Sequence, residues 1–278
     1  MNEPRRQHYV PIMLLQHFTD KDGWLHVLGR QFTTNEVLRL RPDQALVVKH
    51  LHAIYDMDGR KDYSNERILS RIEDAAGPVV KRMISAARRL ERPCLTQQEK
   101  DVWTRFFTSQ WFRSPDLYPP SNIEDEKLEE SVREYFKDNA ERIDHVLNDD
   151  ALPKMIKHNA KAGMALSADQ SSAYGIVERS QVRIAVIKSP RKSFVIGSNS
   201  LAKVIPRGFA SLSRPDGYQW LPIAHDIAVT FASIPDLDES IEIADGQFVR
   251  TVNKATFRQS MQIAGRSRDL VASLAKSG

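Results

Sequence analysis

Cysteine is almost absent from the sequence, since its 278 residues include only Cys94. A single thiol cannot form an internal disulfide, and it excludes a zinc site built from several cysteines. Long apolar runs are absent as well, because no stretch approaches the roughly 20 apolar residues that span a bilayer. The first residues contain no apolar segment of signal-peptide length. We therefore expect a cytoplasmic protein without a membrane partner.

Complete catalytic motifs are also lacking. The Gly-x-Ser-x-Gly turn of many hydrolases does not occur, and Cys94 follows Pro93 without an evident base. No helix-turn-helix, zinc-finger or RNA-binding aromatic signature is visible. Any activity must therefore combine polar residues that lie far apart in the sequence.

The remaining composition is that of a folded protein, with 41% hydrophobic and 27% charged residues. The formal net charge is +4, which is mildly basic. Such a charge is compatible with a nucleic-acid or phosphate-bearing partner, but it equally describes an ordinary solvated surface. Both alternatives stay open.

The N-terminal residues predict a short helix followed by a hairpin. Pro11 suits a first helical turn, and the apolar residues of segment 11–18 fall on one buried face. Residues 24–28 and 35–40 predict two strands. Residues 42–52 fit either a short helix or a strand.

The middle of the chain is predominantly helical by its apolar spacing. Residues 65–90 predict a long helix, which Gly77-Pro78 should kink or split because proline lacks an N–H donor. An aromatic helix follows a capping box at residues 96–99 and ends at Ser114-Pro115. Two further charged helices are predicted, at residues 123–147 and 153–166.

The C-terminal third predicts a sheet, because β-branched and aromatic residues dominate its strands. These strands are expected at residues 182–188, 194–197, 220–221, 227–231 and 241–243, with a closing helix at 248–264. The fold class is α+β: a helical middle packed against a mostly antiparallel C-terminal sheet, with a small N-terminal hairpin. We expect a single domain over residues 1–278, with sub-regions at 1–60, 61–170 and 180–278.

Four segments carry a family resemblance. The opening His8-Tyr9-Val10-Pro11, followed by leucines and Phe18, resembles the start of the DUF4238 family of uncharacterised prokaryotic proteins. Residues 66–73 are similar to its glutamate-bearing helix, and residues 107–115 to its helix that ends in an arginine and a proline. Residues 194–201, followed by Leu221-Pro222, resemble its strand–turn and a later proline-containing stretch. The resemblance implies a shared α+β fold and a shared polar site.

Two of these segments depart from the family pattern. Ser198-Asn199-Ser200 stands where the pattern has Asp-Asn-Pro. The later stretch, Pro222-Ile223-Ala224-His225, lacks the pattern's serine and second proline. A catalytic carboxylate at the turn would therefore be missing, which weakens any mechanism centred on the C-terminal half.

His8 is the first candidate site residue. It precedes a predicted helix N-terminus, whose positive end disfavours the imidazolium, so a neutral His8 could accept a proton or bind a metal. Alternatively, His8 and Tyr9 hydrogen-bond locally and anchor the start of the chain. Tyr9 is otherwise a candidate for ligand binding.

Glu66 and Glu73 lie seven residues apart, which places them on one helix face about 10 Å apart. With His8 they form a candidate ligand set for Mg²⁺ or Mn²⁺, which would activate water for phosphodiester cleavage. Arg113 would hold the phosphate with its planar guanidinium. The alternative is that these glutamates form ion pairs with nearby arginines, Arg113 included.

Three further residues are candidates for ligand binding. Asn199 lies in a turn, where asparagine either contacts a ligand or caps the backbone. Arg82 and Arg89 belong to the densest basic stretch and could follow a phosphate backbone, although a solvated helix face is the alternative.

Two functions are consistent with these residues. The first is a metal-assisted nuclease or other phosphoester hydrolase in phage defence, and it requires His8, Glu66, Glu73 and Arg113 to meet in the fold. The second is a non-catalytic module that binds a nucleic acid, a nucleotide or a protein. A separate basic surface patch would favour the second function, and a polar site with several titratable groups would count against it.

Overall fold

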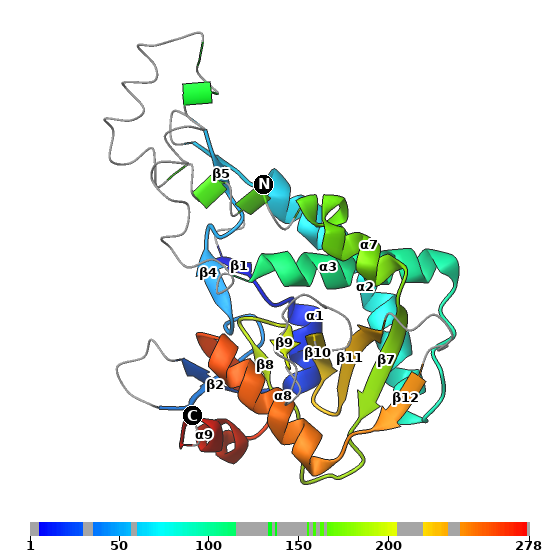
Figure 1. The fold of residues 1–278 in the computed structure, drawn as a ribbon. Coiled ribbons are helices and arrows are strands. Elements are labelled where there is room, and N and C mark those ends of the chain that lie inside the picture. Colours follow the sequence, from blue (N-terminus) through cyan, green and yellow to red (C-terminus); the bar gives the residue numbers. More distant parts are fainter. Residues whose placement is uncertain are drawn as a thin grey trace.

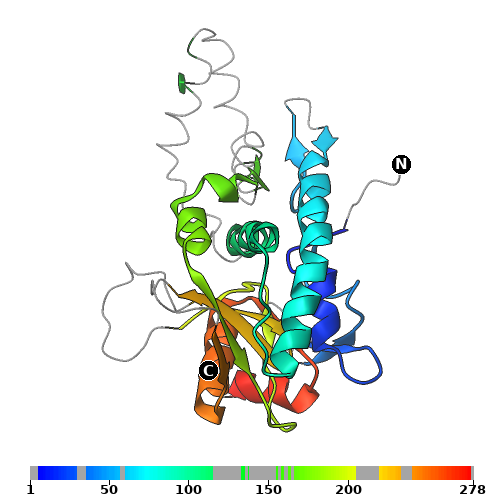
Figure 2. The same ribbon diagram turned by 90° about the vertical axis from the view of Figure 1, so that its right-hand side faces the viewer.

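In the computed structural model, the strands form β-sheets, and helices cover the strands from both sides (Figures 1 and 2). The structure describes residues 6–29, 36–56, 60–114, 166–204, 219–232 and 240–276, with a few isolated residues between 133 and 163. This architecture confirms the α+β class. In the described residues no helix is long and apolar enough to cross a membrane.

The helices enclose the strands. They are α1 (Ile12–Leu15), α2 (Ser64–Arg88), α3 (Gln97–Arg113), α7 (Ser172–Glu178), α8 (Gly246–Gln259) and α9 (Arg268–Lys276), with the 3-10 turns η1 (Gln16–Phe18) and η3 (Ser167–Gln170). The strands are β1 (Arg6–His8), β2 (Leu25–Gly29), β3 (Leu38–Leu40), β4 (Val47–Lys49), β5 (Ile54–Tyr55), β6 (Lys61–Asp62), β7 (Gln181–Val186), β8 (Ile196–Gly197), β9 (Ala202–Lys203), β10 (Gln219–Ala224), β11 (Ile227–Ala232), β12 (Ser240–Ile243) and β13 (Gln262–Gly265).

Two larger sheets organise the strands. The first has the order β12-β7-β11-β10-β9, and only the β12–β7 pair is parallel. The second has the order β3-β2-β13-β8 and is antiparallel throughout. The C-terminal sheet is therefore mostly antiparallel, as the sequence predicts.

Aromatic contacts fix the layers on either side of the first sheet. On one face Phe107 of α3 meets Phe231 of β11, with ring centroids 5.4 Å apart. On the other face Phe248 of α8 packs against Trp220 of β10 at 4.8 Å. Figure 2 shows α3 end-on between α2 and α7, above the strands, with α8 and α9 below them.

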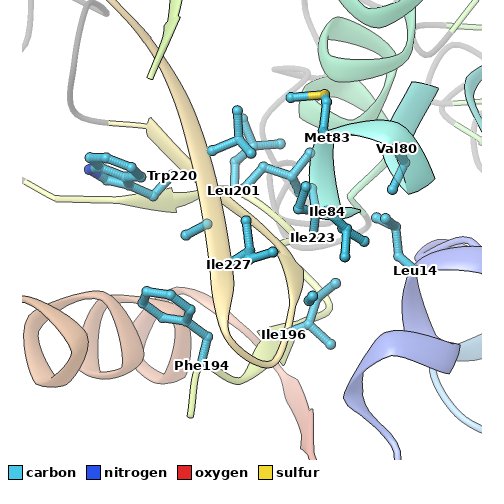
Figure 3. Packing of buried hydrophobic residues seen from close by; sticks show 14 of the residues in the cluster. Leu14, Val80, Met83, Ile84, Phe194, Ile196, Leu201, Trp220, Ile223 and Ile227 are labelled. Carbon is cyan, nitrogen blue, oxygen red and sulfur yellow. The ribbon is translucent and has the colours of Figure 1, made fainter. Parts of the chain in front are cut away.

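The main hydrophobic core lies where α1 and α2 meet the β10–β11 hairpin. Leu14, Met83 and Ile84 face Ile223 and Ile227 across this contact (Figure 3). All of these side chains are buried. Because α1 belongs to the family-like N-terminal segment, the core fixes that segment against the C-terminal strands.

The N-terminal hairpin is present but is not a separate unit. β2 pairs with β3, as predicted, and its other edge pairs with β13, so Leu28 lies opposite Ile263. Strands from the two ends of the chain thus share one sheet.

Two sequence predictions need correction, for the closing helix and for a split of the helix at 65–90, and the choice left open for residues 42–52 is settled. The expected helix at 248–264 ends at Gln259, because Ser260 is extended and residues 262–265 form β13, followed by α9. Residues 47–49 form a strand, which pairs with the unpredicted β1. Helix α2 is not split, because it continues through Pro78. The helices expected at 123–147 and 153–166 lie mostly outside the described residues.

Candidate functional site

Polar side chains from separate segments gather where β1, α2 and α3 meet. His8 ends β1, Glu66 and Glu73 lie on α2, Arg113 is the last residue of α3, and His52 follows β4. In Figure 1, β1 lies beside one end of α3. We call these five residues the polar cluster. It contains all four residues that the sequence analysis names as catalytic.

Local structure explains how each side chain reaches the cluster. The β1–β4 pairing sets His8 opposite Val47, and Pro11 then starts α1. Because α2 is continuous, residues seven positions apart lie on the same face, which carries both glutamates. The capping box of Thr96 and Glu99 starts α3 at its other end.

Arg113 is the hub of the cluster and is only 4% exposed. Its Nη1 donates to Glu73 Oε1 and its Nη2 donates to the backbone carbonyl of His8. Its Nε lies 3.3 Å from His52 Nε2. A buried guanidinium needs such partners, because an unpaired charge is costly in the interior. Protein groups therefore engage all three nitrogens of Arg113. Of the two roles expected for Arg113, phosphate contact or an ion pair with a glutamate, the structure contains the ion pair, with Glu73.

His8 is poised as a neutral imidazole. Burial is the main cause that lowers its pKa, and Arg113 and Arg6 lower it further, against the opposing effects of Pro42 and Glu73. Nε2 is buried and has no hydrogen-bond partner within the described residues, and we take the neutral ring to carry its proton on Nδ1, where the backbone of Pro42 opposes the lowering of the pKa. The lone pair of Nε2 is therefore available to accept a proton.

Glu66 has the opposite character. Burial raises the pKa of its carboxyl group, and the neighbouring Glu73 adds to this effect, while Arg113 opposes it. Its Oε2 is buried and lacks a hydrogen-bond partner among the described residues. Burial is the main cause of both shifts and acts in opposite directions on the two groups, whereas Arg113 lowers both pKa values and Glu73 raises both. Both shifts favour the neutral form of the group: an imidazole that can accept a proton and a carboxyl group that can donate one.

Three buried polar residues in or beside the cluster, His52, Gln7 and Gln110, were not among the predicted site residues. Burial lowers the pKa of His52 well below its ordinary value, and its backbone N–H donates to Gln7 Oε1 at 2.6 Å. Gln7 Nε2 and both amide atoms of Gln110 are buried without partners in the described structure. The available signal was a polar run, Thr108-Ser109-Gln110, inside an otherwise aromatic helix.

The predicted metal-ligand set is not assembled. Across the described residues, no three His, Cys, Asp or Glu side chains lie together in a way that could hold a metal ion. His8, Glu66 and Glu73 therefore do not form the Mg²⁺ or Mn²⁺ site that their sequence pattern suggested. The physical reason is that Arg113 engages a carboxylate oxygen of Glu73, where a metal would otherwise be bound.

Tyr9 and Asn199 have structural partners. The buried Tyr9 donates its hydroxyl to Gln262 Oε1 at 3.0 Å. Asn199 Oδ1 accepts from Leu201 N at 3.3 Å, which is the turn-capping alternative. Ser198, at the position of the family's aspartate, accepts the backbone N–H groups of Met261 and Gln262 at 3.0 and 3.1 Å. This hydroxyl thus anchors the turn to the start of β13.

Arg82 and Arg89 are engaged in surface contacts. Arg82 forms a two-pronged ion pair with Glu99 and donates to the Cys94 carbonyl, which ties α2 to the start of α3. Arg89 pairs with Glu91 and donates to Ser85. The phosphate-tracking role suggested for both residues would have to compete with these bonds.

One comparison with known proteins gave a match. The model of the family described as "Protein of unknown function (DUF4238)" matches residues 6–269. The matched range contains every residue of the polar cluster. Searches of curated proteins and of solved structures gave no match.

Proposed function

The chain belongs to the DUF4238 family, and because the family's description names no reaction, we propose a function from the chemistry of the polar cluster. We propose that the protein cleaves phosphoesters, as a nuclease or related hydrolase, by general acid–base catalysis. The observation that carries this proposal is a pair of buried atoms without partners among the described residues, His8 Nε2 and Glu66 Oε2, on groups whose pKa values shift in opposite directions. Native proteins leave few buried polar atoms unpaired without a reason.

The chemical step uses one proton acceptor and one proton donor. Neutral His8 takes the proton of the attacking water or hydroxyl through Nε2 as its oxygen bonds to phosphorus. The bond from phosphorus to the leaving oxygen breaks, and the protonated Glu66 gives that oxygen its proton. The pair thus ends with a protonated His8 and an ionised Glu66, and solvent exchange restores both.

Arg113 and Glu73 are positioning residues in this scheme. The bond from Arg113 to the His8 carbonyl fixes the backbone that carries the base, and the bond to Glu73 holds α2 beside it. The cationic Arg113 also favours the neutral form of His8. A direct grip on the substrate phosphate by Arg113 is not part of the proposal.

A cleavage assay with the purified full chain tests the proposal. Single- and double-stranded RNA and DNA are offered to the wild type, His8→Ala and Glu66→Gln, with His26→Ala and Glu178→Gln as matched controls outside the cluster. General acid–base groups contribute about 10²- to 10⁴-fold, so each cluster variant should lose at least about 100-fold in rate. Equal activity of the cluster variants and the controls would reject the proposal.

Metal dependence forms a separate arm of the same assay. We expect cleavage to persist in EDTA, because no three candidate ligands converge in the described structure. Cleavage that requires added Mg²⁺ or Mn²⁺ would instead place the catalytic power outside the His8–Glu66 pair.

A non-catalytic binding protein is the second candidate. Two observations favour it. Protein groups already hold all three nitrogens of Arg113. A cavity lined by five basic residues of α8 and of the loops before β8 and α9 lies apart from the cluster. A folded wild type that cleaves no substrate but binds a nucleic acid, a nucleotide or a protein would establish this function. For either function we propose a cytoplasmic location, since a sequence with a single, exposed cysteine has no internal disulfide.

Phage defence is the cellular role that we propose for a nuclease of this family. Plaque counts on cells that carry the wild type should fall below those on cells that carry His8→Ala. Equal plaque counts, with both proteins present in the cells, would reject the role without affecting the chemistry.

A further inference from the structure

A cavity of about 540 Å³ lies between α8, α9 and the loop before β8. Its lining includes five cationic residues: Arg191, Lys192, Arg250, Lys254 and Arg266. No aspartate or glutamate lines it. We call this cavity the basic pocket. It shares no residue with the polar cluster, and α8 and α9 lie well away from β1 in Figure 1.

Within the described part of the chain, no ion pair neutralises the cations of the basic pocket. None of the five forms an ion pair with a described residue, whereas Arg82, Arg88, Arg113 and Arg183 all do. The nearest acids in sequence, Asp245 and Asp269, are not part of the lining. Asp245 instead caps α8 by accepting from Phe248 N at 2.7 Å. Like charges kept around one cavity repel each other, and a bound anion would relieve that repulsion.

Two helix N-termini border the basic pocket, and Asp245 and Asp269 at their starts offset part of their positive charge. Gly246 is the first residue of α8, Ser267 directly precedes α9, and both line the basic pocket. The N-terminal end of a helix carries a partial positive charge and favours anions. Lys192 extends its ammonium over Gly246, so closely that it would have to shift to admit a side chain at position 246. An ammonium against a positive helix end is unfavourable alone, but it suits an anion bound to both.

One wall of the pocket is held rigidly. The buried Asn253 of α8 accepts from Val195 N at 3.0 Å and donates to the Ser193 carbonyl at 2.9 Å. These two bonds clamp the loop that carries Arg191 and Lys192 to the helix that carries Arg250 and Lys254. The site is therefore preformed, which reduces the entropic cost of binding.

The lining also limits the ligand class. It contains apolar Val249, Leu270 and Leu274 but no aromatic residue, so no ring is present on which a nucleobase would stack. The volume suits a small molecule. We propose that the basic pocket binds a small ligand with two or three linked phosphate groups, and that it recognises these phosphates rather than a base. This inference does not depend on the proposed cleavage activity.

Calorimetric titration of the full chain tests the inference, with tripolyphosphate, ATP and inorganic phosphate as probes. We expect tripolyphosphate and ATP to bind with similar affinity and phosphate to bind more weakly. The double variant Arg250→Glu with Lys254→Glu should weaken tripolyphosphate binding by at least about tenfold, because it replaces two attractive charges with repulsive ones.

Matched controls separate a site from general charge. Lys21→Glu with Lys81→Glu makes the same change in net charge at exposed positions elsewhere, and it should bind as the wild type does. Circular dichroism establishes that each variant is folded. The inference is overturned by absence of binding to the wild type, by equal loss in both double variants, or by an ATP preference above about tenfold. Tighter binding of a single-stranded oligonucleotide that is lost in the pocket variant would also overturn it.

Discussion

At the scale of single residues, the shape of the Arg113 side chain holds the polar cluster together. Its planar guanidinium donates hydrogen bonds to Glu73, the His8 carbonyl and His52 from one buried position. A lysine presents a single ammonium and cannot reach three partners in those directions. The geometry around His8 therefore depends on an arginine, not only on a positive charge.

Arg113→Lys should accordingly destabilise the protein by about 2 to 4 kcal/mol, because Glu73, partly buried, loses a close partner and His52 loses its donor. Urea unfolding followed by circular dichroism measures this change. Arg82→Lys is the matched control, since the Arg82–Glu99 pair is largely exposed and should change stability by less than about 1 kcal/mol. Similar losses in the two variants would contradict the buried-hub description.

The sequence indicated several of these residues but not their roles. His8, Glu66, Glu73 and Arg113 stand in segments with a family resemblance, which is why they could be named together. Local sequence cannot show which partners a buried arginine selects, because those partners lie 40 to 105 residues away. His52 was missed because a lone histidine between Leu51 and Ala53 is typical of an ordinary core position.

At the scale of elements, a capping box fixes the start of α3, the helix that ends at Arg113. Thr96 accepts from Glu99 N, and Glu99 accepts from Thr96 N at 2.8 Å. The sequence predicted this capping box because its signature is local. The same Glu99 pairs with Arg82, so the cap also ties α3 to α2.

Thr96→Ala should lower the free energy of unfolding by about 1 kcal/mol, because the first turn of α3 loses its side-chain acceptor. Thr251→Ala is the matched control: Thr251 is exposed within α8 and bonds only to the Gln247 carbonyl of its own helix. It should have little effect, since alanine is the better helix former. Equal losses at the two threonines, measured by urea unfolding, would contradict the role of the cap.

Short strands with distant partners escaped prediction. β1 and β13 have three and four residues, and Gln262–Gly265 pairs with residues more than 230 positions earlier in the chain. Such strands gain their stability from the partner strand and from burial, as at Ile263, rather than from local propensity. Pro78 shows the converse, because tertiary packing of Val79, Val80 and Met83 keeps α2 continuous through a residue that disfavours helices.

At the scale of the whole molecule, buried histidines make stability depend on pH. Burial is the main cause that lowers the pKa values of His8, His17, His52 and His225 in the folded state. As the pH falls below 6.5, the unfolded chain binds protons at these positions more readily than the folded chain does. The contribution of these histidines to the free energy of unfolding is thus fully present above pH 6.5 and decreases as the pH falls below it. Glu66 has the opposite sign, because its raised pKa contributes stability that is lost as the pH rises through it.

The four histidines outnumber the one glutamate, so the urea midpoint should be lower at about pH 5.5 than at about pH 7.5. His225→Gln should show a smaller difference between the two pH values, since it removes one of the four groups. An unchanged or higher midpoint at the lower pH would contradict the assignment of buried neutral histidines.

Connections between the chain ends were beyond sequence reasoning, although the α+β class was predicted correctly. The β2–β13 pairing and the core contact of α1 with β10 and β11 make the N-terminal motif part of the C-terminal fold. The polar cluster and the basic pocket are consequences of this topology, since each combines segments that no local pattern connects.

The pH dependence of kcat/KM for phosphodiester cleavage tests the central claim most directly, because it reports the groups of the free enzyme. We predict a bell-shaped profile, because the reaction needs His8 without its proton, with a pKa lowered from 6.5, and Glu66 with its proton, with a pKa raised from 4.5. His8→Ala should abolish the rising limb and Glu66→Gln the falling limb. A rate that rises steadily into the alkaline range, or limbs that survive in these variants, would contradict acid–base catalysis by His8 and Glu66.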